Sequence, residues 1–433
     1  MIIHTGDNIK IAIFSDTHFG FGTGKEIEND SYDNAIDAFR LSENCDLILV
    51  PGDIFDSRVP KQDVLAKALN IFFRPKELSC DTEFIEIKGK NKHRIHPLNK
   101  TGIPVIAIAG THERRGKDVT NPVELMDSTG YLINLHGETA IYKKGNETVA
   151  ITGISGVPET FAKDVFEKID PKPEQECTNI FLMHQSVGEY VYTDEKSPGL
   201  KLEELPKGFD LIINGHIHWK NQCRIGPDKE TLFLLPGSTI TTQIRKNEAG
   251  KDKGVTIYDT QTKETEFLPI ISQRKVIYNE IRCNNEDIKT IKKKIIEYLS
   301  GLNKEKFEKR PLVRIKVIGQ IEGNNHRIDF SDILKNYEKD FILSLKNNLD
   351  SEKQTKNKEL VAQLIKNTMS IDSMGLKIMK DYADKEKITF DYNHIFELLA
   401  EGNVDAAEKN LLENLTDNID EKLNEKTDKK IDD

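Results

Sequence analysis

The sequence predicts an α/β fold, because short apolar runs alternate with amphipathic stretches over about the first 270 residues. An unbroken apolar run such as 11–14 is typical of a strand buried in a central sheet. Apolar residues at helical spacing over 33–42 and 64–73 indicate helices that cover such a sheet. Several apolar runs stop at a side chain able to bind metal, mostly with a glycine beside it. We therefore expect polar side chains to gather where the strands end.

The expected strands of this region are seven short apolar runs: 11–14, 46–50, 104–109, 149–154, 179–183, 211–214 and 232–235. Residues 1–270 form the first predicted domain. A small α/β unit is expected over 271–345, where an alternating strand at 275–281 precedes an amphipathic helix at 286–299 and a half-buried strand at 312–319. Charged amphipathic helices are expected over 350–415, and residues 416–433 are polar enough to predict a disordered tail.

The composition limits the class of protein. With 433 residues, about three domains are expected at roughly 150 residues each. The net charge of -10 argues against a general nucleic-acid coat protein. No apolar stretch approaches the roughly 18 residues that span a bilayer, so we expect no membrane partner and no export signal. Five widely spaced cysteines without a C-x-x-C pattern predict neither a disulfide framework nor a zinc site, and favour a reducing cytoplasm.

Metal-binding residue types recur at the predicted strand ends. Asp16 and His18 follow the first strand two residues apart, so on an extended backbone they point the same way. Such a D-x-H pair alone is common by chance. The same kind of residue follows later strands, however, and five of the eleven histidines lie in these motifs: His18, His112, His184, His216 and His218. The recurrence favours a shared metal site.

The candidate ligands are Asp16, His18, Asp53, His184, His216 and His218. This mixture of nitrogen and oxygen donors without thiolates suits manganese, iron or zinc. Six candidates exceed the needs of one tetrahedral site, so two metals that share a carboxylate are expected. Two cations about 3.5–4 Å apart can clamp a phosphate and lower the pKa of a bound water. Phosphoester hydrolysis is therefore the predicted chemistry.

The order of these motifs resembles the calcineurin-like metallophosphoesterase superfamily. The pattern consists of D-x-H at 16–18, G-D-x-x-D at 52–56, G-T-H-E at 110–113, the isolated His184 and G-H-x-H at 215–218. The stretches at 109–113, 183–186 and 235–238 further resemble SbcD-type nucleases of DNA double-strand-break repair. The resemblance implies a four-layer α/β/β/α sandwich with a small α/β capping domain and a C-terminal helical extension.

The resemblance also implies a role for each motif residue. One metal would be held by Asp16, His18, Asp53 and His218, and the other by Asp53, Thr111, His184 and His216. Asp53 would bridge the two. His112 would be the catalytic residue that contacts the scissile phosphate and helps to protonate the leaving oxygen. Apart from the resemblance, the basic residues Arg114, Arg115 and Lys117 follow the His112 motif; such clusters are most often solvated surface, and their placement beside the motif makes them candidate DNA contacts.

Three positions depart from the family pattern. Thr111 stands where the usual ligand is Asn, and its shorter hydroxyl is expected to bind metal weakly or through water. Asp56 stands where many relatives have a His that assists exonuclease action, so we assign it at most a supporting role. Glu113 replaces the common Asp and is expected to orient His112 by a hydrogen bond.

The function implied by the resemblance is a manganese-dependent DNA nuclease, with exonuclease and endonuclease activity on double-stranded ends. It would form a homodimer and bind an SbcC-type coiled-coil ATPase through the helices of 350–415. One alternative is a phosphatase or phosphodiesterase for a small molecule or phosphoprotein, which would use the same metals. Another is a scaffold that has lost catalysis and only binds DNA ends. The 271–345 unit could equally be a packing subdomain, and the C-terminal helices could dock on this protein itself.

Overall fold

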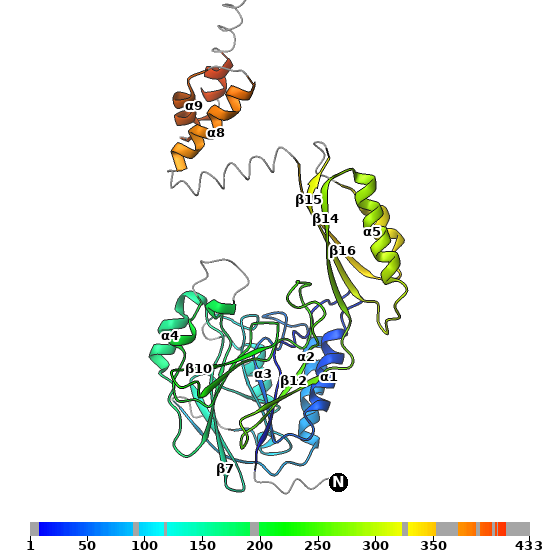
Figure 1. The fold of residues 1–433 in the computed structure, drawn as a ribbon. Coiled ribbons are helices and arrows are strands. Elements are labelled where there is room, and N and C mark those ends of the chain that lie inside the picture. Colours follow the sequence, from blue (N-terminus) through cyan, green and yellow to red (C-terminus); the bar gives the residue numbers. More distant parts are fainter. Residues whose placement is uncertain are drawn as a thin grey trace, which may run out of the picture. The chain divides into compact units, whose positions relative to one another are not determined.

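The computed structural model describes residues 8–89, 95–116, 119–190, 199–322, 328–351, 371–386, 390–400, 403–404 and 406–412 (Figure 1). The chain divides into two units. The first consists of Met1–Glu280, Tyr298–Lys316 and Ser331–Lys346, and the second of Ile281–Glu297, Val317–Phe330 and Asn347–Asp433. The predicted tail at 416–433 lies outside the described residues.

The first unit contains a six-stranded sheet in the order β13-β12-β1-β2-β4-β5. Its parallel strands are β1 (Lys10–Ile13), β2 (Leu47–Pro51), β4 (Val105–Ile108) and β5 (Ile133–Asn134). The strands β12 (Gly254–Asp259) and β13 (Thr265–Pro269) are antiparallel additions beside β1. The helices α1 (Asp30–Leu41), α2 (Gln62–Phe73) and α3 (Pro122–Thr129) belong to the same part of the chain (Figure 1).

A seven-stranded sheet follows the order β10-β11-β9-β8-β7-β6-β3. Its parallel strands are β7 (Glu147–Ile154), β8 (Thr178–Met183), β9 (Leu211–Asn214) and β11 (Thr231–Leu235). Its antiparallel strands are the edge strands β3 (Glu83–Lys88) and β10 (Asn221–Ile225), and β6 (Glu138–Lys144), which lies between β7 and β3. Helix α4 (Ala162–Ile169) lies between β7 and β8 in sequence, and short 3-10 helices occur at Arg74–Glu77, Pro97–Lys100, Glu159–Phe161, Gly188–Tyr190 and Leu202–Glu204.

Alternation along the strands explains why their sequences are apolar throughout. Ala12 and Phe14 belong to a core cluster with residues of α1 and α2, whereas Ile11 and Ile13 belong to a second cluster with residues of the other sheet. A third cluster joins that other sheet to α4, through residues such as Phe166. Because both faces of the central strands are covered, neither face needs polar residues. The predicted α/β class is confirmed.

The later part of the chain forms a three-stranded sheet in the order β14-β15-β16. Its strands are β14 (Val276–Glu286), β15 (Leu312–Ile321) and β16 (Ile342–Ser351), and the helices between them are α5 (Ile288–Leu302) and α6 (Ser331–Asn336). The helices α8 (Ile371–Glu386) and α9 (Tyr392–Ala400) follow. No helix among the described residues has the length and apolar character needed to cross a membrane.

An ion-pair cluster surrounds the N-terminal end of α1 and consists of Glu26, Asp30, Asp33, Arg274, Lys309 and Arg310. Arg274 is its most buried cation, with a side chain that is 7% exposed. Its guanidinium donates to both carboxylate oxygens of Asp30, from Nε at 2.6 Å and from Nη2 at 3.0 Å. Residues separated by more than 240 positions are thereby joined.

We predict that Arg274→Ala lowers the free energy of unfolding by about 3–5 kcal/mol, because Asp30 would keep a buried charge without its bidentate partner. Urea unfolding, followed by the fluorescence of the single tryptophan Trp219, measures the change. Arg40→Ala is the matched control, since Arg40 is 63% exposed in its pair with Asp37. The control should change the free energy by at most about 1 kcal/mol. Equal losses in the two variants would contradict the prediction.

Candidate metal centre

The predicted ligands come together because parallel strands end at one edge of each sheet. Asp16 follows β1, Asp53 follows β2 and Thr111 follows β4 in the first sheet, while His184 follows β8 and His216 follows β9 in the second. Backbone hydrogen bonds continue beyond the strands, from Asp16 N to Gly52 O at 3.2 Å and from His18 N to Asp53 O at 3.1 Å. A bridge between Ser15 and Ser238 also lies at this edge.

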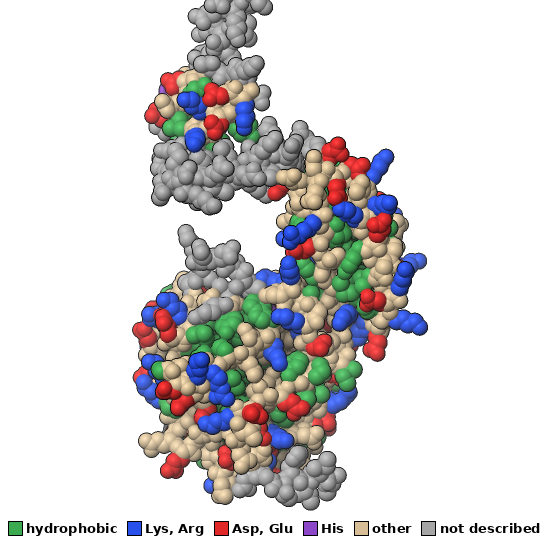
Figure 2. Space-filling view, viewed as in Figure 1, with side chains coloured by type: hydrophobic (Ala, Val, Ile, Leu, Met, Phe, Trp, Pro, Cys, Tyr) green, Lys and Arg blue, Asp and Glu red, His purple; other side chains and the backbone are tan. Residues whose placement is uncertain are grey.

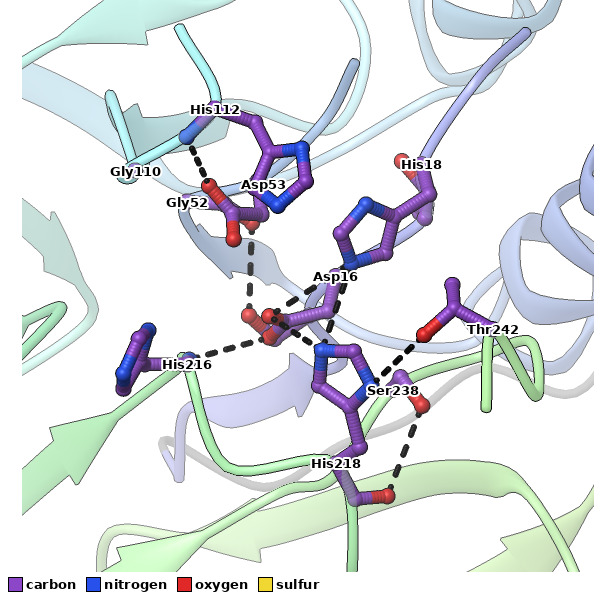
Figure 3. Close-up of polar contacts among 12 residues, drawn as sticks. Asp16, His18, Gly52, Asp53, Gly110, His112, His216, His218, Ser238 and Thr242 are labelled. Atoms are coloured by element: carbon purple, nitrogen blue, oxygen red, sulfur yellow. Dashed lines mark hydrogen bonds and ion pairs between the residues drawn. The ribbon is translucent and has the colours of Figure 1, made fainter. Parts of the chain in front are cut away.

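A first donor group consists of Asp16, His18 and His218 (Figure 3). Asp16 Oδ1 lies 3.5 Å from His218 Nε2 and 3.9 Å from His18 Nε2. The two imidazole nitrogens are 3.3 Å apart. Three lone-pair donors therefore face a common point, as metal ligands do.

A second donor group consists of Asp53, His184 and His216. His184 Nε2 lies 3.1 Å from Asp53 Oδ2. The other carboxylate oxygen, Asp53 Oδ1, accepts from the backbone N–H of His112 at 2.8 Å. The hydroxyl of Thr111 donates to Asp53, 3.2 Å from Oδ2. The structure thus brings together all seven residues predicted to bind metal, and their roles as ligands stay a prediction.

The donor set fits divalent cations. Asp16 Oδ1 is buried and makes no hydrogen bond within the part of the chain that the structure describes, and His184 Nε2 is buried beside the carboxylate of Asp53. Meanwhile the opposite ring nitrogen of His184 lies 2.7 Å from the carbonyl oxygen of Pro51, and that of His218 lies 3.1 Å from the hydroxyl of Thr242. Holding one imidazole nitrogen by a protein acceptor leaves the other to bind metal, which is the usual arrangement in metal sites.

The backbone of the centre is strained. Among the described residues, nine other than glycine have positive φ, and four of these are Asp16, His18, Asp53 and His216. Each such conformation costs about 1–3 kcal/mol and persists only where the surroundings enforce it. Gly52 has a φ of 94°, and a Cβ there would collide with the ring of His184. Tight turns of this kind let side chains from different strands meet.

Burial and pairing act against each other on the acid–base groups. Burial disfavours the charged carboxylate of Asp53, but the nearby His184 prevails and holds the pKa of Asp53 well below its ordinary value. Burial likewise disfavours a charged His184, but Asp53 raises the pKa of His184 to about 10. Burial and repulsion by His184 lower the pKa of His216 to about 4. The lowered pKa of His216 favours the neutral imidazole that binds metal, whereas the raised pKa of His184 opposes it.

The surroundings of His112 correct one expectation. Glu113 does not orient His112, because its carboxylate accepts from the backbone N–H groups of Phe55 at 2.7 Å and Gly110 at 2.8 Å. Burial, followed by repulsion from Asp53, raises the pKa of Glu113 to about 8. His112 is instead held through Nδ1, which lies 3.0 Å from the carbonyl oxygen of Asp56. Glu113 therefore supports the loops on which Asp53 and His112 stand.

The remaining predicted residues lie beside the centre. The carboxylate of Asp56 lies 3.4 Å from His18 Nδ1, which gives it a supporting position. Arg115 donates to the carbonyl oxygen of Thr120 at 3.4 Å. Arg114 follows Glu113 on the same loop, and Lys117 lies outside the described residues.

Sequence reasoning gave no role to Thr242 or to Lys253. The ammonium of Lys253 is buried and donates to the carbonyl oxygen of His218 at 2.7 Å and to Glu248 at 3.1 Å. Neither residue belongs to a spaced motif, so the sequence carried no signal for them. Their contacts exist only because the loop after β11 folds back onto His218.

The comparisons with known proteins agree with this geometry. The calcineurin-like phosphoesterase family model matches residues 9–220. The DNA double-strand break repair protein Mre11 of Thermoplasma acidophilum is 30% identical over 332 residues, which cover 73% of this chain and 79% of that protein. The chain belongs to the Mre11 family. The predicted family and a phosphoesterase-type enzyme are thereby confirmed.

Two further Mre11 relatives share a smaller fraction of identical residues with this chain. The DNA double-strand break repair protein Mre11 of Saccharolobus solfataricus is 25% identical over 324 residues, which cover 72% of this chain and 76% of that protein. The double-strand break repair protein MRE11 of Arabidopsis thaliana is 25% identical over 371 residues, which cover 72% of this chain and 50% of the plant protein. Metallophosphoesterases use divalent metals, and the two donor groups are candidate sites for them.

We predict that manganese stabilises this Mre11 family chain after chelator treatment, because a cation bound only by the folded state adds about 2.7 kcal/mol at a hundredfold excess over Kd. Thermal unfolding with and without MnCl2 measures the shift in Tm. Asp53→Ala, which removes a donor near both groups, should lose most of the shift. His136→Ala is the control, since His136 lies outside both donor groups. A shift of the same size in Asp53→Ala would contradict the prediction.

Proposed function

We propose that this protein is a manganese-dependent DNA nuclease that processes double-strand breaks. The observation that carries the proposal is the pair of donor groups where the parallel strands end. Asp53 contacts both His184 of the second group and the backbone of His112. The relatives are DNA double-strand break repair proteins, which supports DNA as the substrate. The proposed reaction is the hydrolysis of phosphodiester bonds in DNA.

The ligand sets implied by the resemblance extend the two donor groups by Asp53 and Thr111. Asp16, His18, Asp53 and His218 would bind one cation, and Asp53, Thr111, His184 and His216 the other. When bound, two such cations polarise a phosphate and supply a water of lowered pKa for attack. Manganese suits this mixture of imidazole and carboxylate donors.

His112 would act on the leaving group. Its side chain is 44% exposed, so it can reach a phosphate in solution. The carbonyl oxygen of Asp56 accepts from Nδ1–H, which leaves Nε2 as the second proton site. A protonated imidazole can act as a general acid, so Nε2 would give a proton to the departing oxygen. Because the ring is held at Nδ1, the position of this proton is defined before the substrate binds.

DNA binding would depend on local charge. Over the face shown in Figure 2, Lys and Arg side chains are interspersed with Asp and Glu, in keeping with the net charge of -10. Arg114, Arg115 and Lys117 follow the His112 motif directly, so we assign them to the DNA backbone. The domain at 271–345 would limit and position the DNA.

We also propose the assembly. The helices within 350–415 would bind an SbcC-type coiled-coil ATPase, the chain would form a homodimer, and the reducing cytoplasm suits its cysteines, all five of which are unpaired. Exposed apolar side chains on the C-terminal segment, including Leu399 and Val404, fit recognition of a partner helix.

Digestion of linear double-stranded DNA with MnCl2 tests the proposal, set beside turnover of a generic phosphomonoester. We expect DNA degradation that Asp53→Ala abolishes. His112→Ala should lose about 100–10,000-fold in rate, as expected for removal of a general acid. It should still bind manganese, because His112 belongs to neither proposed ligand set. Phosphomonoester turnover with DNA untouched would instead favour the small-substrate alternative.

The partner is tested separately by substitutions on the C-terminal segment. We predict that Leu399→Glu with Val404→Glu abolishes co-purification with the ATPase, because both side chains are exposed and a charge would oppose apolar contact. DNA digestion by the variant alone should stay unchanged. Glu397→Gln, at another exposed position of α9, is the control. Undiminished co-purification would place the partner surface elsewhere.

A further inference from the structure

A chain of hydrogen bonds leads from outside the donor groups to His216. The hydroxyl oxygen of Ser186 lies 2.9 Å from Glu159 Oε1 and 3.1 Å from His216 Nε2. The backbone N–H of Ser186 also donates to Glu159 Oε1, at 3.3 Å. Neither Glu159 nor Ser186 belongs to the predicted ligand set.

The donors and acceptors in this chain admit one order. A carboxylate only accepts, so the single hydroxyl proton of Ser186 goes to Glu159. The lone pairs of the hydroxyl oxygen then remain for His216, whose Nε2 must carry the proton. Neutral imidazole holds one ring proton, so Nδ1 keeps its lone pair. We call this chain of hydrogen bonds, from Glu159 through Ser186 to His216, the relay. It leaves Nδ1 as the ring nitrogen of His216 that can bind a cation.

We propose that Glu159 and Ser186 are positioning residues that fix His216 as an Nδ1 ligand of the second cation. The inference rests on the proposed two-metal site. Glu159 would act through Ser186 and never touch metal or substrate. Second-layer carboxylates of this kind orient a ligand imidazole and make it a better donor.

The fold supports the relay with close backbone packing. Gly156 donates to the carbonyl oxygen of Ala109 at 2.7 Å, and a Cβ at Gly156 would lie 3.1 Å from His184 O and 3.2 Å from Thr111 N. The loop after β7 therefore runs directly against the backbones of two predicted ligands. Three residues later this loop delivers Glu159 to Ser186.

Two further features point to a function of the relay. Glu159 Oε2 is buried and makes no hydrogen bond to any residue that the structure describes, an arrangement that costs stability. The second cation also has the poorer donor set, because the hydroxyl of Thr111 is engaged by Asp53. A weak ligand at position 111 increases the share of binding that His216 must supply. His218, in the first group, is held by Thr242 and is independent of the relay.

Titration of MnCl2 into the metal-free full chain, followed by calorimetry, tests the proposal. We expect the wild type to bind two cations. Ser186→Ala and Glu159→Ala should each weaken one of the two binding events by about 10–100-fold and leave the other unchanged. Ser186→Thr keeps the hydroxyl and should restore the lost affinity. The double variant should be no weaker than Ser186→Ala, because both changes break one relay.

The controls separate positioning from general damage. Ser128→Ala removes an exposed hydroxyl that donates to its own helix, and Glu203→Ala removes a carboxylate that is 77% exposed, so both should bind two cations as the wild type does. Thermal unfolding in chelator shows whether each variant is folded. If Ser186→Ala does not fold, the metal affinity of Glu159→Ala tests the inference. If the folded relay variants bind both cations with wild-type affinity, this inference is wrong and the proposed function still stands. Failure of the wild type to bind two cations would overturn the proposed function as well.

Discussion

Crowding of lone pairs is the constraint on which the rest of this structure depends. Within each donor group, carboxylate oxygens and imidazole nitrogens lie within 4.8 Å of one another, and most of their side chains are buried. No local segment could hold such a set by itself. The arrangement requires two sheets whose parallel strands end at one edge, and three apolar clusters that keep those strands in place. The apolar runs of the sequence thus serve the centre, because they provide the rigidity that the crowded donors need.

The same constraint accounts for the local backbone. A strand that simply continued would carry Asp16 or Asp53 past the edge, so the chain must turn within one or two residues of the strand end. Asp16 and Asp53 take positive φ values at these turns, and the cost is offset by hydrogen bonds such as that from His18 N to Asp53 O. The carboxylate of Glu113 has a related task, since it accepts two backbone N–H groups from neighbouring loops. Its removal would affect the centre through these loops rather than through His112.

Much of this was accessible from the sequence, for a physical reason. Apolar strands and the polar residues that end them are local patterns, so the strands that precede Asp16, Asp53, His184 and His216 could be predicted. The role of these residues as metal ligands stays a prediction. The contacts that support these ligands are not local. Thr242 reaches His218 across 24 positions and Ser186 reaches His216 across 30, through loops whose paths follow no periodicity. For Glu113 the expectation failed, because sequence adjacency to His112 says nothing about the direction in which a side chain points after a sharp turn.

The two proposed ligand sets differ in kind, because only the second includes Thr111. An Asn at position 111 would offer a carbonyl oxygen, which has no proton to give away. The Thr111 hydroxyl has a proton, and it donates a hydrogen bond to Asp53, the carboxylate that both cations would share. This hydrogen bond therefore reduces the negative charge that Asp53 offers to the cations. It also occupies the hydroxyl oxygen of Thr111, which would otherwise be a further ligand. The weakened charge of Asp53 affects both cations, but the loss of the Thr111 donor falls on the second cation alone, while the first keeps Asp16, His18 and His218. The centre should then fill in order, with the first site occupied at lower metal concentration, and the activity of the enzyme should follow the occupancy of the second.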